Sequence, residues 1–97
     1  MLAYIRDTLR RSDQSLDAEI TGNIETAKAD LKNAGVDHSL LERDDPDHLV
    51  RKAIEDYCKW QFDFDGQGER HRTAYENLKA CLSMSSGYKE GTTREGY

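Results

Sequence analysis

The sequence has little of what marks several common classes of protein. It contains one proline and two cysteines in 97 residues. No stretch approaches the ~20 apolar residues that a membrane-spanning helix needs. The first eleven residues, MLAYIRDTLRR, also lack the uncharged hydrophobic core of a signal peptide. We therefore expect a chain made inside the cell, with Cys58 and Cys81 reduced and buried rather than bridged to each other.

Large aliphatic and aromatic side chains are also scarce. Leu, Ile, Val and Phe account for 17 of the 97 residues, and the net charge is −5. A chain of this length builds a small core, because a short chain buries a smaller share of its surface than a long one. The composition therefore predicts a marginal monomer that gains stability from a partner or from copies of itself.

An excess of basic residues is absent as well. The chain has 14 Lys and Arg against 19 Asp and Glu, and its longest basic cluster is the short ERHR at residues 69–72. Binding along duplex DNA needs clustered Lys and Arg that neutralise phosphates. The charge balance therefore argues against a DNA-binding face.

The apolar residues that are present repeat with the period of an α-helix, and no run of alternating β-branched residues suggests a strand. We expect helices over residues 2–11, 16–34 and 69–83, and a further one that opens at Asp45–Pro46 and runs to a glycine turn at 62–69. Gly35 would end the second, and residues 36–45 would form a connection with at most one short turn. The prediction is an all-α fold, a small bundle of about four helices over residues 1–83 with a flexible C-terminal tail over 84–97.

The helix over residues 16–34 has two distinct faces. Its large apolar residues form one narrow seam. Ala18, Gly22 and Ala29 lie together on another face, where the lack of side-chain bulk would let a second helix approach closely. Alanine on a surface is also simply a good helix former, so only Gly22 argues for a contact.

The helix after Pro46 has an apolar arc of about 180°, wider than one neighbour requires. The arc comprises Leu49, Val50, Ala53, Ile54, Tyr57, Cys58 and Trp60. On the opposite side, Arg51, Glu55 and Lys59 at four-residue spacing, with Lys52–Asp56 beside them, are typical of a solvated ladder of ion pairs. We therefore expect a second protomer to cover part of the arc, and the candidate subunit interface comprises Ala18, Gly22, Ala29, Val50, Ile54 and Trp60.

The motifs that suggest chemistry are incomplete. Residues 63–74 begin like a calcium-binding loop, but Ala74 stands where that loop needs a bidentate Glu. His48 and Cys58 lie about 15 Å apart along one helix, too far to share a zinc ion. His71 fits a hydrogen-bonded interior position, and no nucleophile motif or phosphate-binding loop occurs. We expect no catalytic residue, no metal site and no cofactor; the chain is predicted not to be an enzyme.

Three segments, in order, resemble a known family. They are DAEITGNIETAKADLKNAGV at 17–36, DPDHLVRKAIEDYCKWQF at 45–62 and YENLKACLSMSSGY at 75–88. Together they are similar to the small head–tail connector proteins, or head-completion adaptors, of long-tailed bacteriophages and prophages. The chain departs from the family pattern at Trp60 and at DFDGQGE, where members often carry a small residue and an aromatic–glycine turn.

The resemblance implies an α-helical protomer that assembles into a ring, commonly of twelve copies, beneath the portal protein of the filled capsid. Such a ring extends the DNA channel and offers a platform for a stopper or tail-completion protein. DNA would pass through it without sequence-specific binding, and no membrane is involved. The chain would be made in the bacterial host cytoplasm and reside at the virion neck.

Two further sets of residues follow from this reading. Carboxylates that face a channel repel phosphates and let DNA slide; the candidates are Asp13, Asp17, Glu19, Glu25 and Asp30. Surface solubility explains the same carboxylates equally well. Tyr88 and Tyr97 in the tail are candidates for docking on the portal, because tyrosine supplies amphipathic contact area.

A different class of function fits the same helices. A small regulatory binding module, such as an antitoxin-like protein, would act as a dimer with a two-fold, self-complementary interface. The mass of the assembly separates the two hypotheses, since a dimer and a ring differ severalfold.

Overall fold

The structure is a computed structural model that describes residues 1–9, 16–42 and 47–85. All regular elements among these residues are helical, which confirms the predicted all-α bundle. They are α1 (Leu2–Thr8), α2 (Asp17–Asn33), α3 (His38–Leu41), α4 (His48–Gln61), the 3-10 turn η1 (Phe64–Gly66) and α5 (Gly68–Met84).

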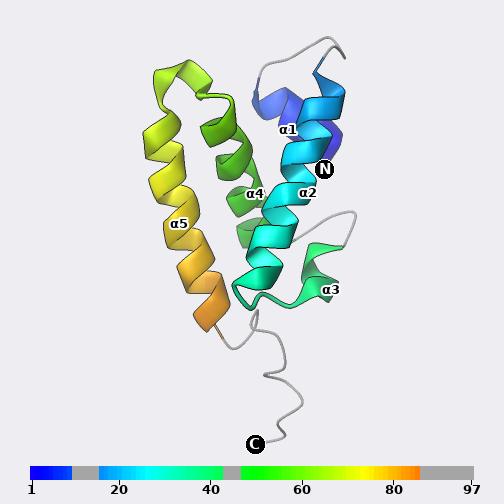
Figure 1. The fold of residues 1–97 in the computed structure, drawn as a ribbon, viewed down its shortest axis with the longest axis vertical. Helices are drawn as coiled ribbons and strands as arrows, with labels where there is room; N and C mark the ends of the chain where they lie inside the picture. The colour runs from blue at the N-terminus through cyan, green and yellow to red at the C-terminus, as the bar shows by residue number, and fades with distance from the viewer. Residues whose placement is uncertain (10–15, 43–46, 86–97) are drawn as a thin grey trace, which may run out of the picture.

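The bundle is organised around α4. Figure 1 shows α4 between α5 and α2, with α1 packed across one end and α3 at the other. Helices α2 and α5 run in the same direction and α4 runs against both. Helix α4 packs on α5 along most of its length and also contacts α2 and α1. It is therefore the central element of the fold.

The core comes from every helix. It contains Ile5, Leu9, Ile20, Ile24, Ala27, Leu31, Val36, Leu41, Val50, Ala53, Ile54, Cys58, Tyr75 and Leu82. The narrow apolar seam predicted for the second helix is confirmed, because its large apolar residues are the buried ones. Fully burying one such aliphatic side chain stabilises the fold by about 1.5–3 kcal/mol.

The ends of the helices follow local backbone chemistry. Gly35 adopts φ +105° directly after α2, a conformation that glycine enters without strain, as the sequence predicts. The short turn allowed for in the following connection is α3, capped by the Asp37 carboxylate, which accepts a hydrogen bond from the Ser39 N–H at 3.0 Å. Helix ends are therefore well predicted where a glycine or a capping carboxylate marks them.

Two helix boundaries differ from the prediction. Helix α1 ends at Thr8 rather than at residue 11. Helix α4 begins at His48, where the carboxylate of Asp47 accepts from the Leu49 N–H at 2.9 Å. The expected start at Asp45–Pro46 lies outside the described residues. Because Asp47 offers the same capping oxygen two residues later, the helix can begin there.

The C-terminal helix runs to Met84, one residue past the boundary expected between domain and tail. Most of the predicted tail lies outside the described residues. The division of the chain into residues 1–83 and 84–97 therefore stays a prediction.

Candidate subunit-contact surfaces

The small-residue surface predicted on α2 is exposed. Ala18, Gly22 and Ala29 are all open to solvent, on the opposite side of α2 from the buried residues Ile20 and Ile24. A Cβ atom added to Gly22 would meet no atom within 4 Å. We call these three residues the α2 face. Nothing in the chain's own packing requires Gly22 to lack a side chain.

Gly22 therefore costs stability without serving the fold of the single chain. We expect Gly22→Ala to raise the free energy of unfolding by about 0.5–1 kcal/mol, because glycine loses more backbone freedom than alanine within a helix. Chemical denaturation followed by circular dichroism measures the change. Gly35→Ala is the matched control: its positive φ predicts a loss of stability, and a loss of similar size at Gly22 would contradict this account.

Two of the predicted interface residues are not on the surface. Val50 and Ile54 are both 0% exposed and lie in the core of the chain itself. Most of the wide apolar arc of α4 is covered by α5 on one side and by α2 and α1 on the other, while Leu49 is 40% exposed. The expectation that a second protomer covers these two side chains is wrong, because the central position of α4 supplies neighbours on both sides.

Trp60 is neither fully exposed nor fully buried. It is half-buried and packs against the core, in ring contact with Tyr57 at 5.4 Å and Tyr75 at 6.3 Å between centroids. The guanidinium carbon of Arg72 lies 5.7 Å from the centre of the Trp60 ring. Much of the Trp60 surface is thus used within the chain, and its part in a subunit contact stays a prediction.

The carboxylates predicted to face a DNA channel divide into two groups. Glu19 and Glu25 are exposed, and Glu25 is only loosely paired with Lys28, at 3.8 Å. Asp17, in contrast, accepts two hydrogen bonds from Arg6, at 3.2 and 3.1 Å, which ties α2 to α1. Asp13 lies outside the described residues. Among the described residues of this group, Glu19 and Glu25 have the most accessible charge.

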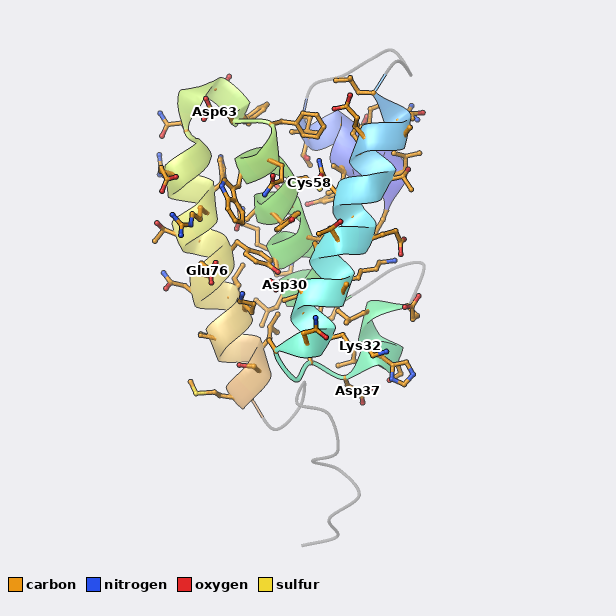
Figure 2. All side chains as sticks on the ribbon, in the orientation of Figure 1. Asp30, Lys32, Asp37, Cys58, Asp63 and Glu76 are labelled. Atoms are coloured by element: carbon orange, nitrogen blue, oxygen red, sulfur yellow. The ribbon has the colours of Figure 1, made fainter. Side chains whose placement is uncertain are left out.

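Asp30 has a structural role that the sequence did not suggest. Its Oδ2 accepts hydrogen bonds from the Tyr75 hydroxyl at 2.6 Å and from Lys79 Nζ at 3.0 Å. Figure 2 shows Asp30 on the side of α2 that faces α5. Burial alone would raise the pKa of Asp30, but the hydrogen bonds from Tyr75 and Lys79 lower it below its usual value. Asp30 therefore links the two outer helices of the bundle.

The expected solvated ladder on α4 is partly buried. Glu55 and Asp56 are 7% and 1% exposed. Glu55 accepts from the Tyr4 hydroxyl at 2.7 Å and pairs with Lys59 at 2.9 Å. Asp56 Oδ1 lies 3.2 Å from His71 Nδ1, which confirms the hydrogen-bonded histidine expected in the last helix. The neighbours that cover these carboxylates come from α1 and α5, which helical periodicity in α4 alone cannot reveal.

Glu55 makes folding sensitive to acid. Burial would raise its pKa, but hydrogen bonds from Lys59 and Tyr4 and the charge of Lys52 bring the pKa below its usual 4.5. A carboxyl whose pKa is lower in the folded state stabilises the fold fully above its unfolded-state pKa, and this stabilisation is lost as the pH falls through the folded-state pKa.

We expect Glu55→Gln to lower the free energy of unfolding at pH 7 by about 1–3 kcal/mol, because charge-assisted hydrogen bonds are lost. The difference from the unchanged protein should shrink as the pH falls from 5 to 2. Thermal unfolding at several pH values measures both effects. Asp30 and Asp37 also have lowered pKa values, but both residues are present in both proteins, so their effects cancel when the two are compared. A difference in the free energy of unfolding that stays constant at all pH values would therefore contradict the role of Glu55.

The two thiols have opposite environments. Cys58 is fully buried, and desolvation raises its pKa to about 12. Cys81 is exposed, so the expectation that it is buried is wrong; it lies at the edge of the apolar stripe of α5. Both cysteines are free. Only Cys81 is therefore accessible to reagents in the folded chain.

The turn that resembles the start of a calcium loop has a structural explanation. Oδ1 of Asp63 accepts a hydrogen bond from the Gly68 N–H at 2.8 Å, at the start of α5. A Cβ atom on Gly68 would lie 2.5 Å from the same oxygen. The aspartate and the glycine thus form one capping arrangement; Figure 2 labels Asp63 at the top of the bundle. Within the described part of the chain, no group of three or more His, Cys, Asp or Glu residues could hold a metal ion.

The family model for "Phage connector protein" matches residues 1–89, nearly the whole chain. This chain belongs to the phage connector protein family. No curated protein and no solved structure matches it. Membership implies a structural protein located at the head–tail region of a virion, in association with other head or tail proteins. No helix of this connector, within the residues described, is long and apolar enough to cross a membrane.

Tyr88 and Tyr97, the residues predicted to dock this connector on a portal, lie outside the described residues. The predicted α2 face is exposed, and its part in a subunit contact stays a prediction; the burial of the carboxylates Glu55 and Asp56 was missed from the sequence. Tyr4 is the residue that could have indicated the burial of Glu55. The two residues are 51 positions apart, however, and only the three-dimensional fold shows that they meet.

Proposed function

We propose that this connector forms a ring of twelve copies beneath the portal protein of the capsid, where it extends the DNA channel and offers a platform for a stopper or tail-completion protein. The match of the family model over residues 1–89 carries the proposal, because it covers all five α-helices of the bundle. The role is structural rather than catalytic.

The surfaces of the chain support a ring of copies. The α2 face is exposed and keeps a glycine that the single chain does not need. A helix face without bulky side chains lets another helix approach closely. A subunit contact at Gly22 would offset the stability that this glycine costs the isolated chain.

Passage of DNA through the ring fits the charge of the chain. The net charge is −5, and carboxylates that line a channel repel the phosphates of DNA rather than bind them. Glu19 is our candidate for a channel-facing residue, since it is exposed and lies beside the α2 face rather than in it. This arrangement would let DNA slide without sequence-specific binding.

The segment after α5 is our candidate for the contact with the portal, with Tyr88 and Tyr97 as its anchors. A deletion of residues 86–97 leaves the whole of α5 in place. It should preserve the folded bundle and weaken attachment to the capsid. Unchanged attachment would overturn the role of the tail and leave the ring proposal intact.

Imaging of purified virions tests the function directly. In phage that carries a tagged copy of this chain, density for the tag should form a ring at the neck, between portal and tail. Phage that lacks the gene should yield DNA-filled heads without tails. Absence of the chain from the neck, or an assembly that is only a two-fold dimer, would overturn the proposal.

A further inference from the structure

We infer that Tyr88, in the segment that follows α5, packs back on an exposed apolar patch of its own chain while the protein is unassembled. The patch lies where α4 begins and α5 ends. It is here called the seam patch and comprises Leu49, Leu78, Cys81 and Met84. The contact belongs to the single chain, so the inference goes beyond the proposed ring and does not depend on it.

The seam patch is apolar surface that the described residues leave uncovered. Met84 is 76% exposed and Leu49 is 40% exposed, Cys81 is exposed and Leu78 is half-buried against the core. The third large hydrophobic residue exposed in the described part of the chain, Tyr4, donates a hydrogen bond to a carboxylate of α4. Apolar side chains that gather at one place, unlike single scattered ones, mark a contact site.

The antiparallel packing of α4 on α5 brings the members of the patch together. Asp56 on α4 contacts His71 on α5. Leu49 precedes Asp56 by seven residues and Leu78 follows His71 by seven residues, so each lies on the same side of its helix as that contact. The other two members follow Leu78 on α5 at three-residue steps. The patch therefore runs from the seam between the helices around the end of α5.

The chain leaves α5 at the seam patch. Ser85 is the last residue that the structure describes, and its N–H donates to the carbonyl oxygen of Cys81 at 3.0 Å. The backbone of Ser85 is extended, with φ −81° and ψ 130°, which ends the helix. Because Ser85 follows Cys81 by four residues, the two lie on the same side of α5. The next segment therefore starts beside the patch.

Tyr88 is the occupant that chain length and composition favour. Residues 86–97, SGYKEGTTREGY, contain no Leu, Ile, Val, Met or Phe and two tyrosines. Tyr88 is three residues past Ser85, so its Cα lies within about 10 Å of the Cα of Ser85. Cys81 lies about 6 Å from Ser85 along the helix. The ring of Tyr88 can therefore reach the patch of its own chain.

The residues around Tyr88 suit a contact of this kind. Gly87 can take the left-handed conformation that reverses the chain without strain. The sulfur of Met84 is a favourable neighbour for an aromatic ring. The hydroxyl of a tyrosine at the edge of the patch stays in water. The contact thus covers apolar surface without burying a polar group.

One tyrosine cannot occupy two sites. Tyr88 is also a proposed anchor on the portal, and this consequence alone rests on the proposed function. Transfer of Tyr88 from the seam patch to the portal would uncover the patch only where a portal is present. The connector would then keep its apolar end covered until it docks, which limits the association of free copies.

The thiol of Cys81 reports on the contact, because it lies in the seam patch while Cys58 is fully buried. The full-length, unassembled chain is treated with iodoacetamide, and mass spectrometry follows alkylation of Cys81. We expect Tyr88→Ser to raise the rate by about threefold or more, because the rate follows the fraction of molecules in which the patch is uncovered. Tyr97→Ser, the same change at the other tyrosine of the segment, should leave the rate unchanged.

A thiol outside the seam patch shows whether the effect is local. Thr73 is exposed on α5, more than two turns before Met84. In a Thr73→Cys, Cys81→Ser chain, Tyr88→Ser should not change the rate of alkylation at position 73. A change there would mean that Tyr88→Ser acts on the whole fold, and it would overturn the inference.

The remaining outcomes also decide. Equal rates at Cys81 with and without Tyr88→Ser overturn the contact, and so does a rise of the same size in Tyr97→Ser. A rate that falls as the protein concentration rises would assign the patch to a second copy and overturn it too. None of these results bears on the position of the chain at the neck, so imaging tests the proposed function separately.

Nuclear magnetic resonance tests the contact directly. In the full-length monomer, we expect nuclear Overhauser effects between the ring protons of Tyr88 and the methyl protons of Met84 and Leu49. Absence of these effects would overturn the inference, whatever the alkylation rates.

Discussion

Replacement of Tyr75 by alanine is expected to lower the free energy of unfolding by about 3–5 kcal/mol, the usual cost of removing a large buried aromatic ring. Tyr75 is 0% exposed and contacts the rings of Tyr57 and Trp60. Small domains have a total stability of about 5–15 kcal/mol, so the variant should retain little of its folded population on warming. Denaturation by urea, followed by circular dichroism, measures the loss.

The hydroxyl group of Tyr75 can be tested apart from the ring. Tyr75→Phe keeps the aromatic packing and removes the 2.6 Å hydrogen bond to Asp30, which should cost about 1.5–3 kcal/mol because the acceptor is charged. In the Asp30→Asn background, the same change should cost less, since the two groups interact. Equal costs in both backgrounds would show that the hydrogen bond does not contribute to stability.

Replacement of Ile54 by alanine should lower the free energy of unfolding by about 2–5 kcal/mol, because it removes a fully buried side chain and leaves a cavity. The loss should be the same at low and high protein concentration. A subunit-interface role predicts the opposite, a small loss in the monomer and a large effect on assembly. Urea denaturation at two protein concentrations distinguishes a core role of Ile54 from a subunit-interface role.

Leu49→Ala is the matched comparison on the same helix. Leu49 is 40% exposed, so its removal should cost the single chain clearly less than the removal of Ile54. A loss at Leu49 as large as the loss at Ile54 would contradict the division of α4 into a core side and an exposed seam.

The helical fold could be predicted from the sequence because the signals that define it are local. The 3.6-residue apolar period identified four of the helices, and Gly35 marked the end of α2. Where two capping residues compete over a few positions, as Asp45 and Asp47 do, the sequence does not decide between them. The start of α4 was therefore expected too early.

The surfaces of α4 could not be predicted from α4 alone. Periodicity showed that Val50 and Ile54 need apolar neighbours, but it did not reveal that α5, α2 and α1 of the same chain supply them. The spacing of Glu55 matched a solvated ion-pair ladder, yet Tyr4 covers it from a position 51 residues away. The α2 face was predictable because its exposure depends on one helix only.

The shared carboxylate of Asp30 also has a mechanical consequence for the bundle. Helices α2 and α5 do not pack extensively against each other, and Asp30 joins them through Tyr75 and Lys79. A force that pulls the outer helices apart would therefore act on these two bonds as well as on the packing of both helices against α4. The two bonds would limit how far α2 and α5 can move apart while both stay packed on α4.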